Sequence, residues 1–141
     1  MRPWVIDANV WVAAADPQDP RATVSRRFLL AMTRSRERVV MPAIAPLEVA
    51  CALAHRFRSA TTGRALARRL ARSERITLLE IDALSDRAVE LGTELFLRAA
   101  GALYVAAARE ADGHLISWDP ELIQRAGAAT PEEWLVTHTE P

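Results

Sequence analysis

The sequence predicts an α/β fold: a three-layer α/β/α sandwich with a short central parallel sheet. Two observations predict it. Short apolar runs typical of buried strands occur at residues 4–6, 38–41, 76–81 and 114–118. Each run is followed by a longer segment whose apolar residues recur every three or four positions, which is the pattern of an amphipathic helix. Strands that alternate with helices in this way form a parallel sheet covered by helix layers.

The helices are expected from the apolar spacing and from prolines and aspartates at their starts. A short helix near 10–15 follows the first strand, and the turn at 16–20 contains two prolines and two aspartates. Asp19 and Pro20 are a typical cap and first residue of the next helix, which runs to about Ser35. Further helices are expected at about 46–58, 63–72, 84–97, 102–110 and 121–126, with an edge strand near 128–130 and a turn or short helix at 131–135.

Length and composition indicate one domain spanning residues 1–141, because 141 residues at 50% hydrophobic content can bury a sizeable core. Cys51 is the only cysteine, which excludes an internal disulfide and is typical of a reducing compartment. Asp7 interrupts the apolar run near the amino terminus, so no signal peptide is expected. The longest nearly uncharged run, 39–55, contains two prolines and a glutamate and is no membrane span. We therefore expect a cytoplasmic protein.

The charges are divided unevenly although the net charge is zero. Residues 1–75 hold 14 arginines and 6 acids, whereas residues 76–141 hold 4 arginines and 12 acids. All 18 basic residues are arginine. The absence of lysine excludes a Walker-A phosphate loop and enzymes that form a Schiff base through a lysine amine.

Seven arginines fall within residues 56–75, where Glu74 is the only acid. Such a patch attracts phosphates without reading base sequence, so it fits an RNA partner. Two alternatives remain: an ordinary solvated surface, or a surface that docks on the acidic half of another chain. The seven residues are Arg56, Arg58, Arg64, Arg68, Arg69, Arg72 and Arg75.

Three acids are predicted to meet at one edge of the sheet. Asp7 follows the first strand and Asp119 follows the fourth, and the carboxyl ends of parallel strands share one edge. Glu48 lies in the first turn of the helix after the second strand, at the same edge. Clustered carboxylates cannot all stay ionised without a compensating positive charge, and Mg²⁺ or Mn²⁺ suits oxygen ligands. Such an ion lowers the pKa of a bound water and neutralises charge on a phosphodiester. We expect Asn9 to orient that water or ligand.

Each acid also has a simpler explanation. Asp7 and Asp119 are each placed to cap the helix that follows, because Asp is among the preferred N-cap residues. Glu48 is favourable in a first helical turn through the helix dipole. The coincidence of all three at one edge favours a shared site.

Four blocks of the sequence together resemble the PIN domain family, and within it the VapC-type toxins of bacterial and archaeal toxin–antitoxin pairs. No single block is specific to the family. The order and spacing of the four blocks are specific, and the resemblance covers essentially the whole chain. The blocks are Val5-Ile6-Asp7-Ala8-Asn9, Pro46-Leu47-Glu48-Val49-Ala50, residues 97–106 around Ala102-Leu103-Tyr104, and Leu115-Ile116-Ser117-Trp118-Asp119-Pro120-Glu121-Leu122.

The resemblance implies a single-strand ribonuclease that uses Mg²⁺ or Mn²⁺ held by acids, three of which match Asp7, Glu48 and Asp119. It also implies a homodimer and a small antitoxin that enters the active-site groove. One departure stands out: Gly101 occupies the position where the family normally has an aspartate. Its loss is expected to weaken cation binding. The alternative function is a degenerate PIN domain that binds RNA or a protein without efficient cleavage. Glu94, seven residues before Gly101, is the nearest acid that could take the place of the missing aspartate.

Overall fold

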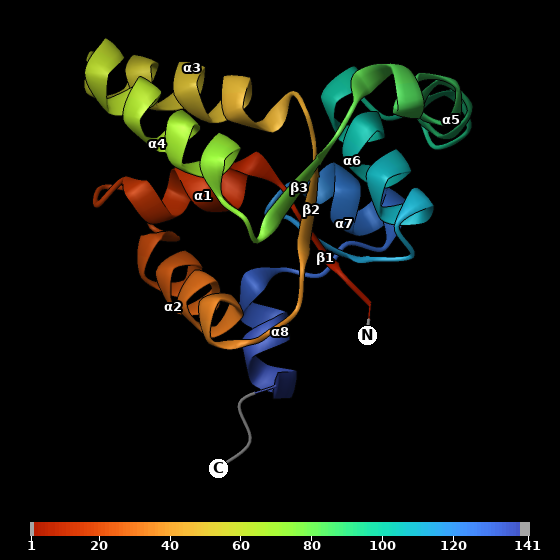
Figure 1. Cartoon of the computed structure of the whole chain (residues 1–141). Helices are drawn as coiled ribbons and strands as arrows, with labels where there is room; N and C mark the ends of the chain where they lie inside the picture. Colours follow the sequence, from red (N-terminus) through yellow and green to blue (C-terminus); the bar gives the residue numbers. More distant parts are fainter. Residues whose placement is uncertain (1, 139–141) are drawn as a thin grey trace.

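The central sheet has four short parallel strands, as the sequence predicts (Figure 1). Their order is β3-β2-β1-β4. The computed structural model describes residues 2–138. The strands are β1 (Trp4–Ile6), β2 (Val39–Pro42), β3 (Ile76–Leu79) and β4 (His114–Ile116). Every residue of β1 and β2 is buried, because both strands are covered on both faces. In β1, Trp4 lies beside Val39 of β2 and His114 of β4.

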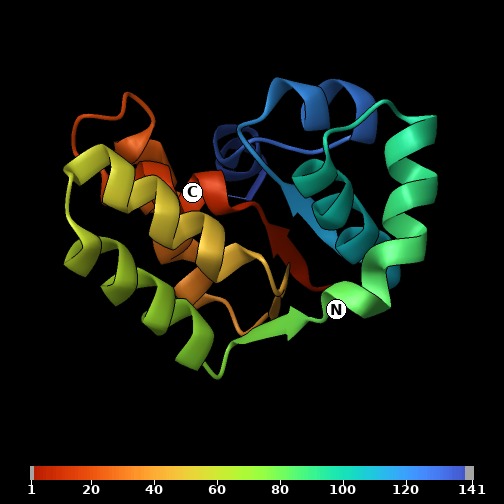
Figure 2. The ribbon, with the colours of Figure 1, turned by 90° about the horizontal axis from the view of Figure 1, so that it is seen from above.

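Helices cover both faces of the sheet and complete the predicted α/β/α layers. In Figure 2, α1 to α4 lie on one side of the strands and α5 to α7 on the other. Helix α6 packs directly on β1, β2 and β4, and its buried Ala-rich side allows this close approach. The helices are α1 (Ala8–Ala15), α2 (Ala22–Arg34), α3 (Ala45–Phe57), α4 (Ala60–Arg72), α5 (Ile81–Glu94), α6 (Ala99–Glu110), α7 (Pro120–Ala126) and α8 (Pro131–His138).

Some predicted boundaries were wrong. Strand β3 stops at Leu79 and α5 begins at Ile81, three residues before the expected start. The chain between α5 and α6 turns at Phe96, whose φ of 56° lies in the left-handed region, so α5 ends before residue 97. Helix α6 begins at Ala99, so Gly101 lies within its first turn and not at a junction. The expected edge strand at 128–130 is a single bridge from Ala129 to Ile116.

One buried core joins the layers, and it includes Phe28, Met41, Leu53, Leu84 and Leu122. Burial of this apolar surface is the main term that stabilises the fold. Within residues 2–138, no single helix is long and apolar enough to cross a membrane; α5 and α6 meet the length and composition test only as a pair bent by 114°.

Candidate active site

Asp7 is held between the end of β1 and the start of α1. Its Oδ1 accepts a hydrogen bond of 3.3 Å from the backbone N–H of Asn9, so it caps α1. Its Oδ2 accepts a 2.7 Å hydrogen bond from the hydroxyl of Ser117, which follows β4. The residue is only 8% exposed. The Asp7 carboxylate can therefore cap α1 and belong to the shared site at the same time.

Ser117 is the centre of a hydrogen-bond network that joins β1 and β4. Besides donating to Asp7, its fully buried Oγ accepts from the Asn9 amide at 3.2 Å and from the backbone N–H of Asp119 at 2.9 Å. A hydroxyl has one hydrogen to donate and two lone pairs, so Ser117 uses its full capacity. The Asn9 carbonyl in turn accepts from the Trp118 N–H at 3.3 Å. The Asn9 side chain thus ties α1 to the end of β4.

Tyr104 of α6 connects Glu48 to the start of α1, next to Asp7. Its hydroxyl donates a 2.8 Å hydrogen bond to Oε1 of Glu48 on α3 and accepts one of 3.2 Å from the N–H of Ala8. The ring is buried, with 1% exposure. Because Tyr104 comes from the opposite helix layer, it fixes the distance between α3 and the start of α1.

The three predicted acids line one cavity of about 280 Å³ at the carboxyl edge of the sheet. Asp119 reaches it as the N-cap of α7, where its Oδ1 accepts from the Glu121 N–H at 2.9 Å. A larger cavity of about 550 Å³ is lined by Trp4, His114 and Trp134 among others, but by none of these acids. The smaller cavity is therefore the candidate site. Its walls include Asp7, Asn9, Glu48, Arg56, Gly101, Tyr104 and Asp119.

Two of these carboxyl groups hold their protons more tightly than usual. Burial raises the pKa of Asp7, and the nearby charge of Asp119 adds to this, although the Ser117 hydrogen bond opposes it. Burial also raises the pKa of Glu48, the Tyr104 hydrogen bond lowers it, and the charge of Asp7 raises it. The acids therefore repel one another across the cavity. The same burial and the two carboxylates raise the pKa of the Tyr104 hydroxyl well above its usual value, so Tyr104 stays a donor.

The chemistry of this donor set fits a hard divalent cation. Within residues 2–138, no arginine or histidine forms an ion pair with Asp7, Glu48 or Asp119. In the same part of the chain, no hydrogen bond reaches Oε2 of Glu48 or Oδ2 of Asp119. Oxygen ligands with uncompensated charge are those that Mg²⁺ and Mn²⁺ accept. Within the described residues, no three His, Cys, Asp or Glu side chains are arranged so that they could hold an ion. Asp7, Glu48 and Asp119 would therefore have to come closer together to bind one.

Gly101 lines the cavity without contributing a ligand. Gly101 lies inside α6 and its φ is not positive, so the backbone does not require a glycine there. A Cβ placed there would lie 3.1 Å from Cδ2 of Leu122, a buried side chain of α7. The replacement considered for the missing acid, Glu94, does not line the cavity.

Sequence reasoning missed three residues of the site: Ser117, Tyr104 and, as a cavity residue, Arg56. Ser117 was detectable as a polar residue two positions before Asp119 at the end of an apolar strand. Arg56 was detectable because it lies eight residues after Glu48, on the same face of one helix. Nothing in the sequence separated Tyr104 from an ordinary core aromatic residue.

Comparison with known proteins identifies the family of this chain. The family model of the PIN domain matches residues 4–128. The chain belongs to the PIN domain family, which is a family of nucleases. Comparison with curated protein sequences found no match.

Solved structures share the fold at low sequence identity. VapC20 of Mycobacterium tuberculosis, a sarcin-ricin loop cleaving toxin, aligns with a TM-score of 0.73 at 17% identity over 89% of this chain and 95% of its own. A toxin–antitoxin complex from Klebsiella pneumoniae gives a TM-score of 0.66 at 17% identity, covering 91% and 97%. FitAcB from Neisseria gonorrhoeae gives a TM-score of 0.61 at 18% identity, covering 92% and 97%. At these identities the likeness concerns the fold.

Proposed function

We propose that this PIN domain is a metal-dependent endoribonuclease that hydrolyses phosphodiester bonds of single-stranded RNA, and that it is the toxin of a toxin–antitoxin pair. One observation carries the proposal: Asp7, Glu48 and Asp119 line a single cavity at the carboxyl edge of the sheet. Carboxylates without basic partners in a nuclease fold fit metal-assisted hydrolysis.

In this proposal Asp7, Glu48 and Asp119 hold Mg²⁺ or Mn²⁺. A bound ion would supply an activated water and would neutralise charge on the phosphodiester. The chain's own contribution is to orient the acids. Ser117 and the Asn9 N–H hold Asp7 by hydrogen bonds, and the Tyr104 hydroxyl holds Glu48. We retain for Asn9 the role of orienting a water or ligand, because its Nδ2 has a second N–H besides the one donated to Ser117.

The arginine-rich surface supports an RNA substrate. All seven arginines in residues 56–75 are exposed and lie on or beside α3 and α4. The guanidinium of Arg75 is engaged, because it donates to the carbonyls of Thr33 and Ser35 at the end of α2. Within residues 2–138, the side chains of five exposed arginines of this stretch form no hydrogen bond or ion pair: Arg58, Arg64, Arg68, Arg69 and Arg72.

The proposed partners are a small antitoxin protein and a second copy of the chain. The likeness to the Klebsiella pneumoniae toxin–antitoxin complex and to VapC20 supports the first. An antitoxin would silence the nuclease by entering the cavity. Size-exclusion chromatography with light scattering, with and without the product of an adjacent short open reading frame, tests both partners.

A ribonuclease assay tests the proposed activity. Purified protein is incubated with a labelled single-stranded RNA and Mn²⁺, beside the Asp7→Asn variant and a reaction containing EDTA. We expect cleavage only by the wild type with Mn²⁺, because Asp7→Asn removes one carboxylate while keeping its shape and its helix cap. Equal cleavage by Asp7→Asn, or none by the wild type, would reject the proposal.

Gly101 favours a second candidate function, a PIN domain that binds RNA or a protein without cleaving it. The site lacks a carboxylate at this position, and Leu122 fills the adjacent space. This candidate predicts RNA binding by the wild type with no Mn²⁺-dependent cleavage. Cleavage that depends on Asp7 would reject it.

A further inference from the structure

Helix α3 presents three residues to the cavity at intervals of four. Glu48, Ala52 and Arg56 all line it, and residues four apart lie on one face of a helix. At a rise of 1.5 Å per residue, the Cα atoms of Glu48 and Arg56 are separated by about 12 Å along the helix axis. Among the side chains that line this cavity in the described chain, Arg56 is the only basic one.

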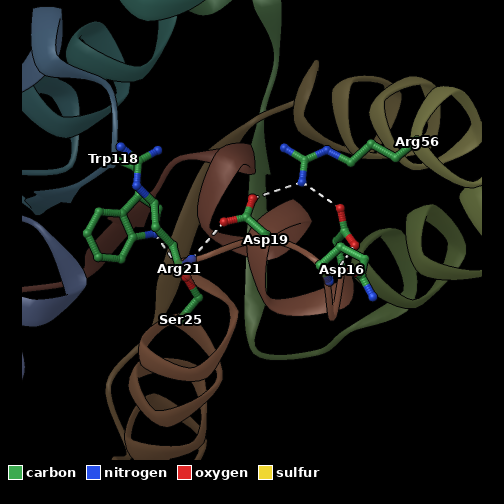
Figure 3. Close-up of polar contacts among 7 residues, drawn as sticks. Asp16, Asp19, Arg21, Ser25, Arg56 and Trp118 are labelled. Atoms are coloured by element: carbon green, nitrogen blue, oxygen red, sulfur yellow. Dashed lines mark hydrogen bonds and ion pairs between the residues drawn. The ribbon is translucent and has the colours of Figure 1, made fainter.

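Two aspartates of the α1–α2 turn hold the Arg56 guanidinium in place (Figure 3). Its Nη1 donates to Oδ2 of Asp16 at 2.9 Å and to Oδ2 of Asp19 at 2.8 Å. Oδ1 of Asp19 also accepts from the Arg21 N–H at 2.8 Å. The predicted N-cap role of Asp19 was wrong, because α2 begins at Ala22 with Arg21 as its N-cap. These hydrogen bonds, of which the one to Asp19 has the largest effect, raise the pKa of Arg56. Arg56 is therefore fully charged and fixed in one orientation.

The outer side of this guanidinium remains open. The side chains of Asp16 and Asp19 are only 13% and 12% exposed, whereas that of Arg56 is 38% exposed. Within residues 2–138, neither Nε nor Nη2 of Arg56 donates a hydrogen bond, which leaves three of its five N–H groups free. An anion that enters the cavity therefore meets the guanidinium and not the carboxylates behind it.

We propose that Arg56 is a phosphate-binding residue of this site, and that it holds an RNA phosphate beside the three acids. The inference rests on the proposed ribonuclease function. A planar guanidinium with free donors matches the oxygens of a phosphate, and its fixed orientation reduces the entropy lost on binding. The aspartates bind only Nη1 of the guanidinium, so the N–H groups of Nε and Nη2 remain to bind the phosphate.

A salt titration without divalent metal tests the proposal. Binding of a fluorescein-labelled single-stranded RNA is followed by anisotropy in EDTA at increasing KCl. Each phosphate contact on a single strand contributes a slope of about −0.7 to log K against log salt. We expect Arg56→Gln to bind several-fold more weakly at low salt, with a slope shallower by about 0.7. The control is Arg87→Gln on α5, an exposed arginine outside this surface, whose slope should match the wild type.

Two further variants separate phosphate binding from a purely structural role. The double variant Asp16→Asn, Asp19→Asn breaks both ion pairs but keeps the guanidinium. Because the loss of two negative charges outweighs the looser orientation of Arg56, RNA binding should be equal to or tighter than that of the wild type. Arg56→Lys should keep the salt slope, because it keeps the charge. If the double variant loses RNA affinity as Arg56→Gln does, at matched thermal stability, Arg56 is only structural.

These measurements can reject the phosphate-binding role of Arg56 without rejecting the proposed ribonuclease function. A wild type that cleaves RNA with Mn²⁺, together with an unchanged slope for Arg56→Gln, overturns the Arg56 assignment alone. A wild type that neither cleaves nor binds RNA overturns both.

Discussion

The Ser117 hydroxyl donates a 2.7 Å hydrogen bond to Oδ2 of Asp7, across 110 positions of sequence. Because Ser117 also accepts from Asn9 and from the Asp119 N–H, one buried oxygen orients parts of the site from both β1 and β4. A hydrogen bond to a charged group contributes more than one between neutral groups, about 1.5–3 kcal/mol.

Replacing Ser117 with alanine should therefore disturb Asp7 first. We expect Ser117→Ala to lower the free energy of unfolding by about 1–3 kcal/mol, because buried Asp7 and the half-buried Asn9 amide each lose a partner. The Ser117 hydrogen bond lowers the pKa of Asp7, so its loss should raise that pKa further. The acidic limb of the activity–pH profile should then move to higher pH. An unchanged limb in a folded variant would contradict the role given to Ser117.

Asp7→Asn should stabilise the metal-free protein at neutral pH. Burial raises the pKa of Asp7 above its ordinary 3.8, so the folded state binds a proton more tightly than the unfolded chain. Between the ordinary and the raised pKa the folded state holds more protons, and the free energy of unfolding therefore falls as pH rises. Asn keeps the cap through its Oδ1 and removes the charge. Its Nδ2 cannot accept from Ser117, but the effect of burial on the pKa of Asp7 is larger than that of the Ser117 hydrogen bond. Each unit of raised pKa is equivalent to about 1.4 kcal/mol.

Thermal melts in EDTA across pH measure this effect. The melting temperature of Asp7→Asn should exceed that of the wild type by a few degrees at neutral pH, and the gap should close in acid, where Asp7 is protonated in both states. Mn²⁺ should then raise the melting temperature of the wild type but not of the variant. If the variant is less stable than the wild type at every pH, the charge of Asp7 does not destabilise the metal-free protein.

Tyr104→Phe should weaken the link between α6 and Glu48. The variant keeps the buried ring but removes the donor to Glu48 and the acceptor for the Ala8 N–H. An unsatisfied buried N–H costs about 1–3 kcal/mol, which urea unfolding will measure. Metal affinity should fall by roughly ten- to a hundred-fold, as is usual when an outer partner of a ligand is lost. Unchanged calorimetric affinity for Mn²⁺ would argue against Glu48 as a ligand.

Gly101→Asp should strengthen Mn²⁺ binding measured by calorimetry, because it adds a carboxylate to the cavity wall. Gly101→Ala is the matched control, since it brings the same Cβ within 3.1 Å of Leu122 Cδ2 without a charge. Both variants should shift Leu122 slightly and should melt at similar temperatures. If the two bind Mn²⁺ equally, an acid at this position does not contribute to the site.

Much of the fold and of the acid cluster was predictable from the sequence. Short apolar runs alternating with amphipathic segments predict the parallel sheet, and this topology by itself places Asp7 and Asp119 at one edge. The boundaries around α5 and α6 were not predictable, because the left-handed turn at Phe96 has no glycine to mark it. The sequence predicts a junction at Gly101, but Gly101 lies inside α6, where Leu122 packs close to it.

The sequence by itself determined the fold class, the family and the edge at which the acids gather, because these follow from local periodicity and from the direction of successive strands. Only the tertiary structure decided which groups orient those acids. Ser117 reaches Asp7, Tyr104 reaches Glu48, and Arg56 reaches Asp16 and Asp19, each from another part of the chain. Such contacts depend on how whole layers pack, and a side chain gives no local sign of the distant partner it will bind.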